Sequence, residues 1–243
     1  MKKFLILLFF VLNGFCHAQT IPTPVRADWT IDRLMDRNGL SGSDQLYGVG
    51  ISPGELIGDT YLNNRWNRAS FLLYKDEKLI EGVWTRYDIK GDLFEIQTNM
   101  GLKIVDGKNI KSFVWLDSIT NGASFFINTR DLKTGKGKIY SFMEVISDGK
   151  LPLLKRTYIN IKKADYRPEF DTGSKDDIIL KVDEFYVLRD DQLIDLPRKK
   201  KEIFSLFGDR SVELENFYKV NGLRVNEERS LILLFNEYNL LVK

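Results

Sequence analysis

The stretch that decides the fold is IYSFMEVISDGKLPLLKRTYINI, residues 139–161. Two runs rich in apolar and β-branched residues, Ile139–Ile146 and Leu151–Ile161, flank the polar tetrapeptide Ser147–Lys150. The Asp148–Gly149 pair within it tolerates the positive φ that a tight hairpin turn requires. This segment therefore predicts two antiparallel strands joined by a turn.

Similar runs continue on both sides of this hairpin, separated by turn dipeptides such as Gly91–Asp92 and Asp106–Gly107. On the N-terminal side the predicted strands cover residues 69–74, 79–87, 93–98, 102–105, 110–116 and 123–128. On the C-terminal side, Ile178–Leu188 and Leu193–Ile194 predict one more hairpin. An open meander of this length leaves unpaired edges, so we expect a curled sheet or a partly closed barrel.

The pattern becomes helical near the C-terminus. Arg198–Phe207 predicts a first helix, and Ser211 and Asn226 are candidate N-caps of two more. The spacing of one helical stripe recurs in the last of these, at Leu231, Leu234, Phe235 and Tyr238. Short helices are not stable alone, so the three must pack on one another or on the sheet. The predicted class is α+β: an antiparallel β meander, a β-hairpin and a short three-helix C-terminal segment.

The first residues, Met1–Ala18, have the features of a secretory signal peptide. Lys2 and Lys3 precede an apolar run, and Cys16 and Ala18 place small residues at the −3 and −1 positions of a cleavage site. Past Ala18, no apolar run approaches the roughly 18 residues that span a membrane. We therefore expect an exported protein that is periplasmic or associated with the outer membrane, with no transmembrane span in the mature chain.

The predicted cleavage also removes Cys16 and His17, the only cysteine and histidine of the 243 residues. Without them the mature chain has no Ser-His-Asp triad, cysteine nucleophile, disulfide or zinc site of the usual ligands. Its Lys+Arg count falls from 36 to 34, which equals the Asp+Glu count of 34. A formally neutral chain lacks the basic surplus that nucleic-acid binding needs. We expect no metal, cofactor or nucleic acid, and an envelope protein or small ligand as partner.

We divide the chain into four parts. A signal peptide covers residues 1–18, and an irregular arm with a short candidate helix at Trp29–Met35 covers 19–45. The β-meander domain spans 46–165, and the hairpin with the helical C-terminal region spans 166–243. The last boundary follows a polar, turn-rich change of composition after Ile161.

A familiar pattern lies within the predicted meander. It consists of Gly58-Asp59-Thr60-Tyr61-Leu62-Asn63, then Trp66, Arg86-Tyr87-Asp88 and Asp92-Leu93-Phe94-Glu95. Over roughly Gly58–Asn128 the chain resembles a group of uncharacterised exported β-rich proteins of the Bacteroidota. Trp66 and Ala69 stand here where that group carries Phe and Gly. The resemblance implies an envelope location and a β-rich N-terminal part, and it implies no activity.

The segment Phe170–Ser174 carries the Asp-Thr-Gly-Ser motif of aspartic proteases, which makes Asp171 the catalytic candidate. In that chemistry two carboxylates share one proton and activate a water molecule. A polar stretch precedes the motif here, where the protease motif follows an apolar strand. We favour a loop in which Asp171 and Ser174 bond to backbone groups and Gly173 takes a positive φ. A carboxylate-dependent hydrolase remains the alternative.

A candidate ligand-binding surface consists of Trp84, Arg86, Tyr87 and Asp88. Strand alternation places Trp84 on one face with Arg86 and Asp88, and places Val83, Thr85 and Tyr87 on the other. An aromatic ring among charged side chains is either the wall of a pocket or an exposed surface residue.

The one basic cluster consists of Arg198, Lys199, Lys200 and Lys201. Such a run can contact anionic headgroups or another polyanion. Acidic residues on both sides offset its charge, among them Asp195 and Glu202. We favour a solvated face and keep an anionic-surface contact as the alternative.

These patterns together favour an exported, periplasmic or envelope-associated protein that binds a partner or ligand and performs no catalysis. One alternative is the aspartic-protease-like hydrolase at Asp171. A second is a lipocalin-like carrier of an apolar ligand, which requires a closed barrel with an internal cavity.

Overall fold

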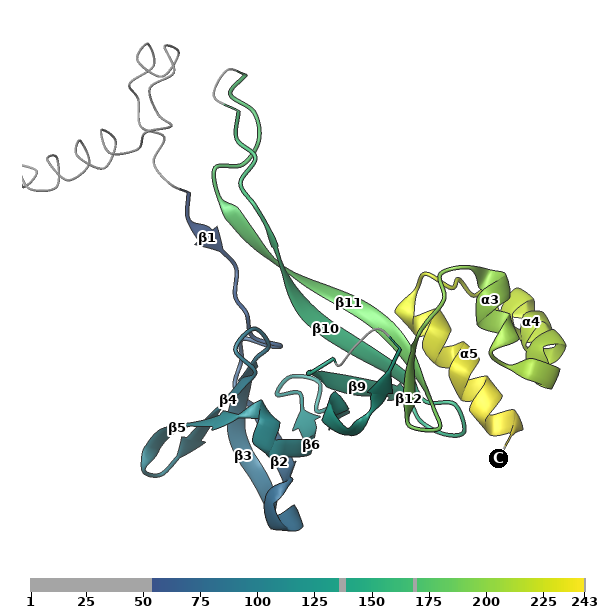
Figure 1. Cartoon of the computed structure of the whole chain (residues 1–243), viewed down its shortest axis with the longest axis horizontal. Helices are drawn as coiled ribbons and strands as arrows, with labels where there is room; N and C mark the ends of the chain where they lie inside the picture. The colour runs from purple at the N-terminus through teal and green to yellow at the C-terminus, as the bar shows by residue number, and fades with distance from the viewer. Residues whose placement is uncertain (1–53, 136–138, 168–169, 243) are drawn as a thin grey trace, which may run out of the picture. The chain divides into compact units, whose positions relative to one another are not determined.

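The structure, a computed structural model, describes residues 54–135, 139–167 and 170–242. The predicted signal peptide, the irregular arm and the helix expected at Trp29–Met35 lie outside the described residues. The described part is α+β, a mostly antiparallel sheet followed by three α-helices (Figure 1). None of the described helices combines the length and the apolar character needed to cross a membrane.

The described strands form one 12-stranded sheet. They are β1 (Leu56–Ile57), β2 (Asn67–Leu73), β3 (Leu79–Asp88), β4 (Leu93–Thr98), β5 (Gly101–Asp106), β6 (Ile110–Leu116), β7 (Ala123–Asn128), β8 (Lys133–Thr134), β9 (Phe142–Ser147), β10 (Leu153–Lys162), β11 (Asp177–Arg189) and β12 (Gln192–Asp195). Each strand predicted from the turn dipeptides is present, with ends shifted by at most a few residues. β1 and β8 were not predicted, because two-residue strands have no periodicity.

The strand order is β5-β4-β3-β2-β6-β7-β9-β10-β11-β12-β8, and β1 pairs in parallel with β11. From β2 onward, successive strands are neighbours except at two points. β6 returns from the edge strand β5 to pair with β2, and β8, which lies between β7 and β9 in the chain, pairs in parallel with β12. The two ends of this order, β5 and β8, are not paired with each other in the described residues.

The sheet is therefore not closed, and as a whole it is not strongly curled, so the expectation of a curled sheet or partly closed barrel is wrong for the whole sheet. Only the strands from β4 to β9 bend together, around an aromatic core. The physical reason lies in the edges of the sheet. A sheet can stay open when its edge strands are short or carry charge. β8 has only two residues, and β5 carries the exposed Lys103.

The hairpin predicted from residues 139–161 is confirmed by the pairing of β9 with β10. Gly149 in its turn has φ +139°, and a Cβ there would lie 2.6 Å from Cγ of Asn239. The turn therefore requires glycine both for its backbone and for the close approach of the C-terminal helix.

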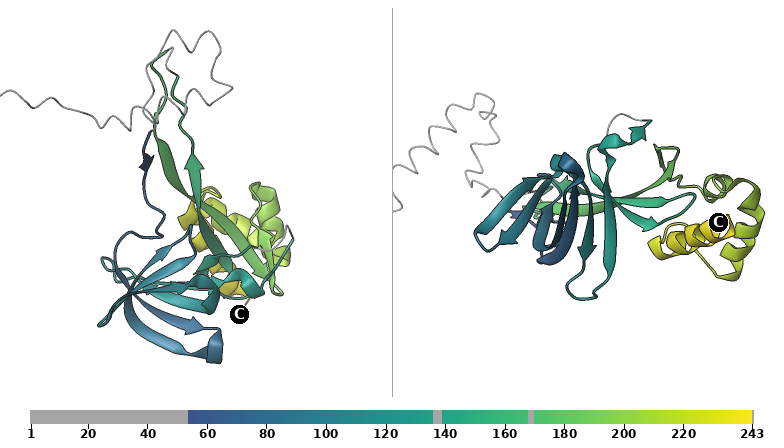
Figure 2. Two further views of the ribbon diagram at one scale, coloured as in Figure 1. Left: turned by 60° about the vertical axis from the view of Figure 1, so that its left-hand side comes forward. Right: turned by 90° about the horizontal axis from the view of Figure 1, so that it is seen from below.

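β10 then forms a long hairpin with β11, paired at ten successive positions from Leu153↔Val187 to Lys162↔Ile178. The sheet thus continues across residue 165, where we divided the β-meander domain from the C-terminal region. Only Leu153, Leu154 and Lys155 of β10 also pair with β9. Beyond them the hairpin extends out of the wider sheet, and β1 pairs with β11 only at its far end, at Asp177 and Ile178 (Figure 1 and the left view of Figure 2).

An aromatic core fills one face of the strands from β4 to β9. Phe94 is fully buried, and its ring centroid lies 5.2 Å from Phe71, 4.4 Å from Tyr87, 5.1 Å from Phe113 and 5.4 Å from Phe142. Phe94 belongs to β4 and Phe142 to β9, although β3, β2, β6 and β7 separate these strands in the sheet. These strands therefore bend around a shared cluster of rings, most of them edge-to-face.

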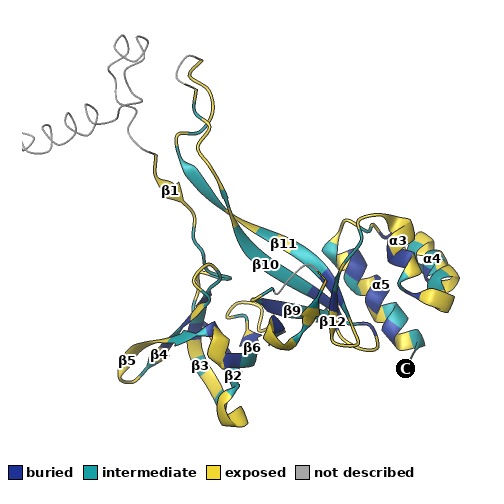
Figure 3. Cartoon of the chain, viewed as in Figure 1, coloured by how far each residue is buried: buried dark blue, intermediate teal, exposed yellow. Residues whose placement is uncertain are grey.

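The three described helices are α3 (Lys200–Ser205), α4 (Ser211–Val220) and α5 (Glu228–Leu241). Their apolar faces form a second core with Leu151, Leu153 and Val187 of the β10–β11 region. Figure 3 shows buried and exposed positions alternating along α5, as its predicted apolar stripe requires. The three helices thus pack on one another and on the sheet, as expected.

The predicted N-caps are wrong by one residue. α4 begins at Ser211 itself, and its N-cap is Arg210, which makes no side-chain capping bond. A 3₁₀ turn, Gly208–Arg210, leads directly into this helix, so the chain never takes the extended conformation of an ordinary cap. The N-cap of α5 is Glu227 in place of Asn226.

Candidate functional site

The four residues predicted as a ligand surface lie on opposite faces of β3. Tyr87 is only 4% exposed, stacks on Phe94, and its hydroxyl donates to Oδ1 of Asp92 at 2.9 Å. Burial raises the pKa of Tyr87 well above its usual value, and the neighbouring Asp92 adds to the effect. Trp84 lies on the other face, 42% exposed, with the Arg68 guanidinium 5.4 Å from its ring. Tyr87 is thus a core residue that does not share a surface with Trp84.

Arg86 holds the side chains of Tyr61, Trp66 and Glu95 together on that outer face. Its guanidinium lies 4.5 Å from the ring centroids of both Tyr61 and Trp66. It also donates to Oε2 of Glu95, from Nε at 3.1 Å and from Nη2 at 2.5 Å. The Tyr61 hydroxyl donates to the other oxygen of Glu95 at 2.7 Å. Arg86 therefore fixes both ends of the Tyr61–Trp66 segment against the sheet.

Asp88, the last of the four, takes part in backbone structure. Its Oδ1 accepts from the Lys90 backbone N–H at 3.1 Å, and the residue forms an isolated bridge with Tyr61. Arg86 and Asp88 thus both contact or pair with the Tyr61 region. Their placement indicates a structural role for them.

Asp171 lies exposed in the loop between β10 and β11. It has φ +48°, and its Oδ1 accepts the Tyr166 hydroxyl at 2.8 Å. Gly173 takes φ +91°, and the Ser174 hydroxyl donates to the Asp176 carbonyl at 3.1 Å. Gly173 and Ser174 agree with the predicted loop, whereas Asp171 accepts from a side-chain hydroxyl and not from a backbone group. Catalysis by Asp171 stays a prediction.

The basic cluster lies at the start of α3, and Arg198, Lys199, Lys200 and Lys201 are all exposed. Lys199 forms an ion pair with Glu202 at 3.2 Å. The Nζ of Lys200 lies 4.1 Å from the ring centroid of Tyr218 on α4. Two of the four cations are therefore engaged within the helical segment.

A cleft of about 330 Å³ lies on the face of the sheet that also carries the aromatic core. We call it the cross-strand cleft, because each of the neighbouring strands β6, β7, β9, β10 and β11 contributes to it. Its lining residues are Leu62, Asn63, Trp115, Asp117, Ser124, Phe126, Glu144, Lys155, Thr157, Lys181 and Asp183. None of the polar residues among them was a candidate site residue in the sequence.

The register explains why these residues meet. Trp115 lies opposite Ser124, Phe126 opposite Glu144, Glu144 opposite Lys155, and Thr157 opposite Asp183. Directly opposed residues of antiparallel strands share a face. The pairing therefore sets one row of side chains across five strands.

Lys155 is the best-connected charge in the cleft. Its ammonium lies 2.9 Å from Oε2 of Glu144 and 2.9 Å from Oε1 of Glu228, the first residue of α5. Ser124 donates to the second oxygen of Glu144 at 2.7 Å. Burial lowers the pKa of Lys155, but the bonds to Glu228 and Glu144 outweigh it, so the pKa is raised overall.

Other polar groups of the cleft are held by nearby partners. Thr157 donates to Oδ1 of Asp183 at 2.5 Å, and Lys181 donates to Oδ1 of Asp59 at 2.9 Å. Asp117 accepts from the backbone N–H groups of residues 119 and 120, at 2.9 Å and 2.7 Å. These backbone bonds, that of Thr120 foremost, hold the pKa of Asp117 below its usual value. Each of these polar side chains therefore already has a partner within the protein.

The floor of the cleft is the margin of the aromatic core. Trp115 is 5% exposed and Phe126 is 7% exposed. Both rings pack on Phe113, with centroids at 6.1 Å and 4.5 Å. The cleft therefore has polar walls above two aromatic rings that are themselves almost fully buried.

A second hollow, of about 290 Å³, lies among β2, β3, β4 and β5. Its lining is mostly apolar: Phe71, Leu73, Ile80, Ile96, Val105 and Ile110, with Lys75 and Asn109. Because the sheet is not closed, this hollow is not the barrel interior that a lipocalin-like carrier would use.

Comparison of the chain with protein-family models, curated proteins and solved structures found no match. The resemblance to exported Bacteroidota proteins stays a prediction.

Proposed function

We propose that this is an exported, periplasmic or envelope-associated protein that binds a small polar ligand in the cross-strand cleft and does no chemistry on it. The observation that carries the proposal is the row of polar side chains across β6–β11, fixed by one another above an aromatic floor. A volume of about 330 Å³ is at the small end of ligand sites, which run from roughly 300 to 1,000 Å³.

The electrostatics of the cleft support binding over catalysis. The raised pKa of Lys155 keeps its ammonium protonated, which makes it a poor nucleophile and a poor base. The lowered pKa of Asp117 keeps that carboxylate ionised, so it is a poor general acid. Neither shift brings the pKa of its group toward the working pH, which is where general acid–base catalysis is most effective.

A fragment screen of the whole protein by NMR tests this proposal. We expect polar fragments to perturb the backbone amides of residues that line the cleft. Ser124→Ala should weaken these hits, because it removes a bond that fixes Glu144. Ser112→Ala is the matched control, since Ser112 lies on the opposite face of β6. Hits that gather elsewhere, or that ignore Ser124→Ala, would contradict the proposal.

A second candidate is an apolar ligand in the hollow among β2–β5, favoured by its six apolar lining residues. The same screen distinguishes this candidate from the cross-strand cleft, because apolar fragments would then perturb the amides around Phe71 and Ile96.

The hydrolase alternative is tested separately. We expect Asp171→Asn to leave the rate of peptide cleavage unchanged, and loss of an activity measured for the unaltered protein would revive that alternative.

A further inference from the structure

The outer edge of β5 is free to bond with another chain. β5 is the last strand of the order at its end of the sheet, and within the described residues only β4 pairs with it. Successive residues of a strand direct their N–H and C=O groups to alternate sides, so β5 leaves about three N–H and about three C=O groups on the free side. Such an edge is a template for a further strand.

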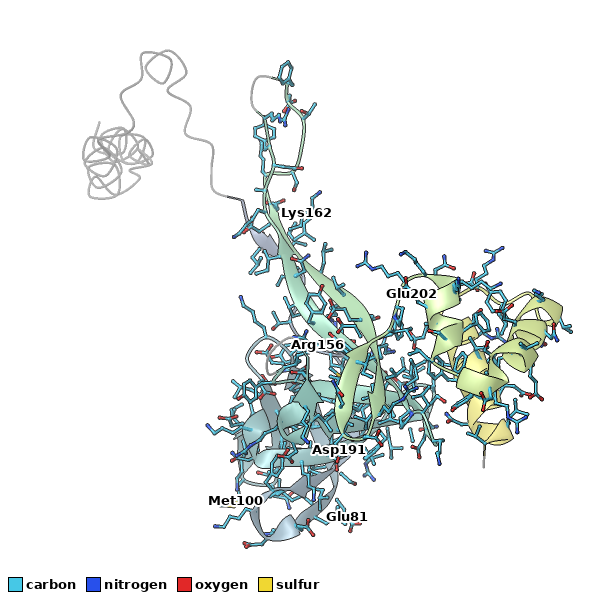
Figure 4. The ribbon with its side chains drawn as sticks, turned by 45° about the vertical axis from the view of Figure 1, so that its right-hand side comes forward. Glu81, Met100, Arg156, Lys162, Asp191 and Glu202 are labelled. Carbon is cyan, nitrogen blue, oxygen red and sulfur yellow. The ribbon has the colours of Figure 1, made fainter. Side chains whose placement is uncertain are left out.

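Apolar side chains of β5 are also uncovered. Leu102 and Ile104 are 56% and 55% exposed, and Met100, in the turn before the strand, is 88% exposed (Figure 4 labels Met100). The strand contains no proline, which would remove a donor for pairing. An exposed apolar edge strand of this kind favours pairing with another chain.

The other face of β5 borders the hollow among β2–β5. Val105 lines this hollow beside the half-buried side chains of Leu73 and Ile80. In a strand added next to β5, every second side chain would point to this same face. The side chain opposite Val105 would therefore contact the hollow while the backbone of the same segment bonds to β5. A strand edge beside a side-chain pocket suits an extended peptide.

The charges at this edge favour an acidic partner. Lys103 lies on the same face as Val105, and Lys75 lines the hollow. Neither lysine forms an ion pair in the part of the chain that the structure describes. A second copy fits this edge less well, because antiparallel pairing of two β5 strands about a two-fold axis would place their Lys103 side chains opposite or diagonal to each other.

We propose that β5 is a docking edge for an extended acidic peptide segment of another protein. The segment adds to the sheet as a strand and places an apolar side chain against the hollow among β2–β5. The observation behind the proposal is the free edge of β5 beside that hollow. The proposal is independent of ligand binding in the cross-strand cleft.

The first test selects octapeptides from a random phage-displayed library against the whole protein. We expect the selected sequences to combine apolar residues with at least one Asp or Glu. The most frequent sequence, made synthetically, should shift the amides of β5 and of Leu73 and Ile80 in the ¹⁵N-labelled protein. Selection of no peptide, or shifts confined to other surfaces, would overturn the proposal.

Two N-methylated forms of that peptide test the backbone bonds. One form is methylated at the odd-numbered residues and the other at the even-numbered residues, so each blocks the N–H groups of one side. We expect one form to bind at least about tenfold more weakly and the other to bind like the parent peptide, because an added edge strand bonds through one side only. Equal behaviour of the two forms would overturn the proposal, and equal full binding would make the hollow a site for side chains alone.

Charge reversal tests the acidic preference. Lys103→Glu should weaken binding of the parent peptide about tenfold, since it replaces an attractive cross-strand pair by a repulsive one. Lys219→Glu, at an exposed position on α4, makes the same change of charge and should leave the affinity unchanged. Equal effects of the two substitutions would contradict docking at β5.

A second copy of the chain as occupant is tested by hydrogen exchange at low and high protein concentration. We expect the β5 amides to exchange at the same rate in both. Protection that grows with concentration would identify β5 as a contact between two copies and would overturn the proposal.

Discussion

Phe94 shows at the scale of one residue how this sheet holds together. Its ring touches rings from β2, β3, β6 and β9 and is fully buried. Phe94→Ala should lower the free energy of unfolding by about 3–5 kcal/mol, because the cavity lies where four neighbours meet.

Urea unfolding measures this change, and Phe125→Ala is its control. Phe125 is on the same sheet but 43% exposed, so its loss should cost less than about 1 kcal/mol. Equal effects of the two substitutions would show that the aromatic cluster does not stabilise the fold as described.

Asn239 joins the last helix to the β9–β10 turn through buried bonds. Its Oδ1 accepts from the Leu151 backbone N–H at 2.9 Å, and its Nδ2 donates to the Leu151 carbonyl at 3.2 Å. Asn239→Ala should therefore lower the free energy of unfolding by about 1–3 kcal/mol, since it leaves buried backbone groups without partners. Thermal or urea unfolding measures this loss, and Asn216→Ala, at an exposed position on α4, is the control. A loss no larger than that of the control would contradict this role.

At this scale, sequence could predict the face of a residue but not its neighbours. The alternation in β3 places Tyr87 opposite Trp84, and the burial of Tyr87 confirms it. The ring contacts of Arg86 with Tyr61 and Trp66 depend on how the preceding segment crosses the sheet, which local periodicity does not contain.

At the scale of elements, the β10–β11 hairpin changes character along its length. Near Leu153–Lys155 it lies within a wider sheet, and from Arg156 to Ile161 it is a two-stranded ribbon in the described part. At the far end, opposite Lys162, β1 also pairs with β11 (Figure 4 labels Arg156 and Lys162). Two-stranded ribbons are only marginally stable in water.

Some backbone amides of residues 156–161 donate to β11. We expect these amides to exchange hydrogen at least about tenfold faster than the amides of β6. That ratio corresponds to a difference of about 1.4 kcal/mol in the free energy of opening. β6 has a partner strand on each side and is the internal control. NMR-detected exchange measures both in one sample. Equal protection would mean that something else covers the ribbon.

Turn dipeptides and alternation were sufficient to predict ten of the twelve described strands and the clearest hairpin. They did not predict the return of β6 to β2 or the parallel pairs of β1 and β8, because these pairings join distant segments. The cross-strand cleft was missed for the same reason. Ser124, Glu144, Lys155 and Asp183 each look like an ordinary exposed strand residue until the register sets them in a row. The one sign of the cleft in the sequence was that these polar residues lie on a face of the sheet that elsewhere is buried and aromatic.

For the whole molecule, buried tyrosines make stability depend on pH in the alkaline range. Burial raises the pKa of Tyr186 to about 12, with its bond to Glu184 adding to the effect, and burial also raises the pKa of Tyr87. Tyrosines in the unfolded chain ionise near pH 10. A pKa raised by folding gives stability that is present below about pH 10 and is lost as the pH rises toward about 12.

We therefore expect the free energy of unfolding to change little between about pH 8 and 9 and to fall above about pH 10. Urea unfolding at a series of pH values measures this, and Tyr186→Phe should make the alkaline fall shallower. A stability that is constant or rises above about pH 10 would contradict the burial described for these residues.

The cross-strand cleft depends on both halves of the described chain, since β6 and β7 provide its floor and β10 and β11 its far wall. The most direct measurement is the map of backbone-amide shifts when the ¹⁵N-labelled protein is titrated with the polar fragment that binds most tightly in the screen. We predict that the amides near Trp115, Ser124, Glu144, Lys155 and Asp183 shift together with one affinity. Shifts confined to other surfaces, or no shift at all, would contradict ligand binding in this cleft.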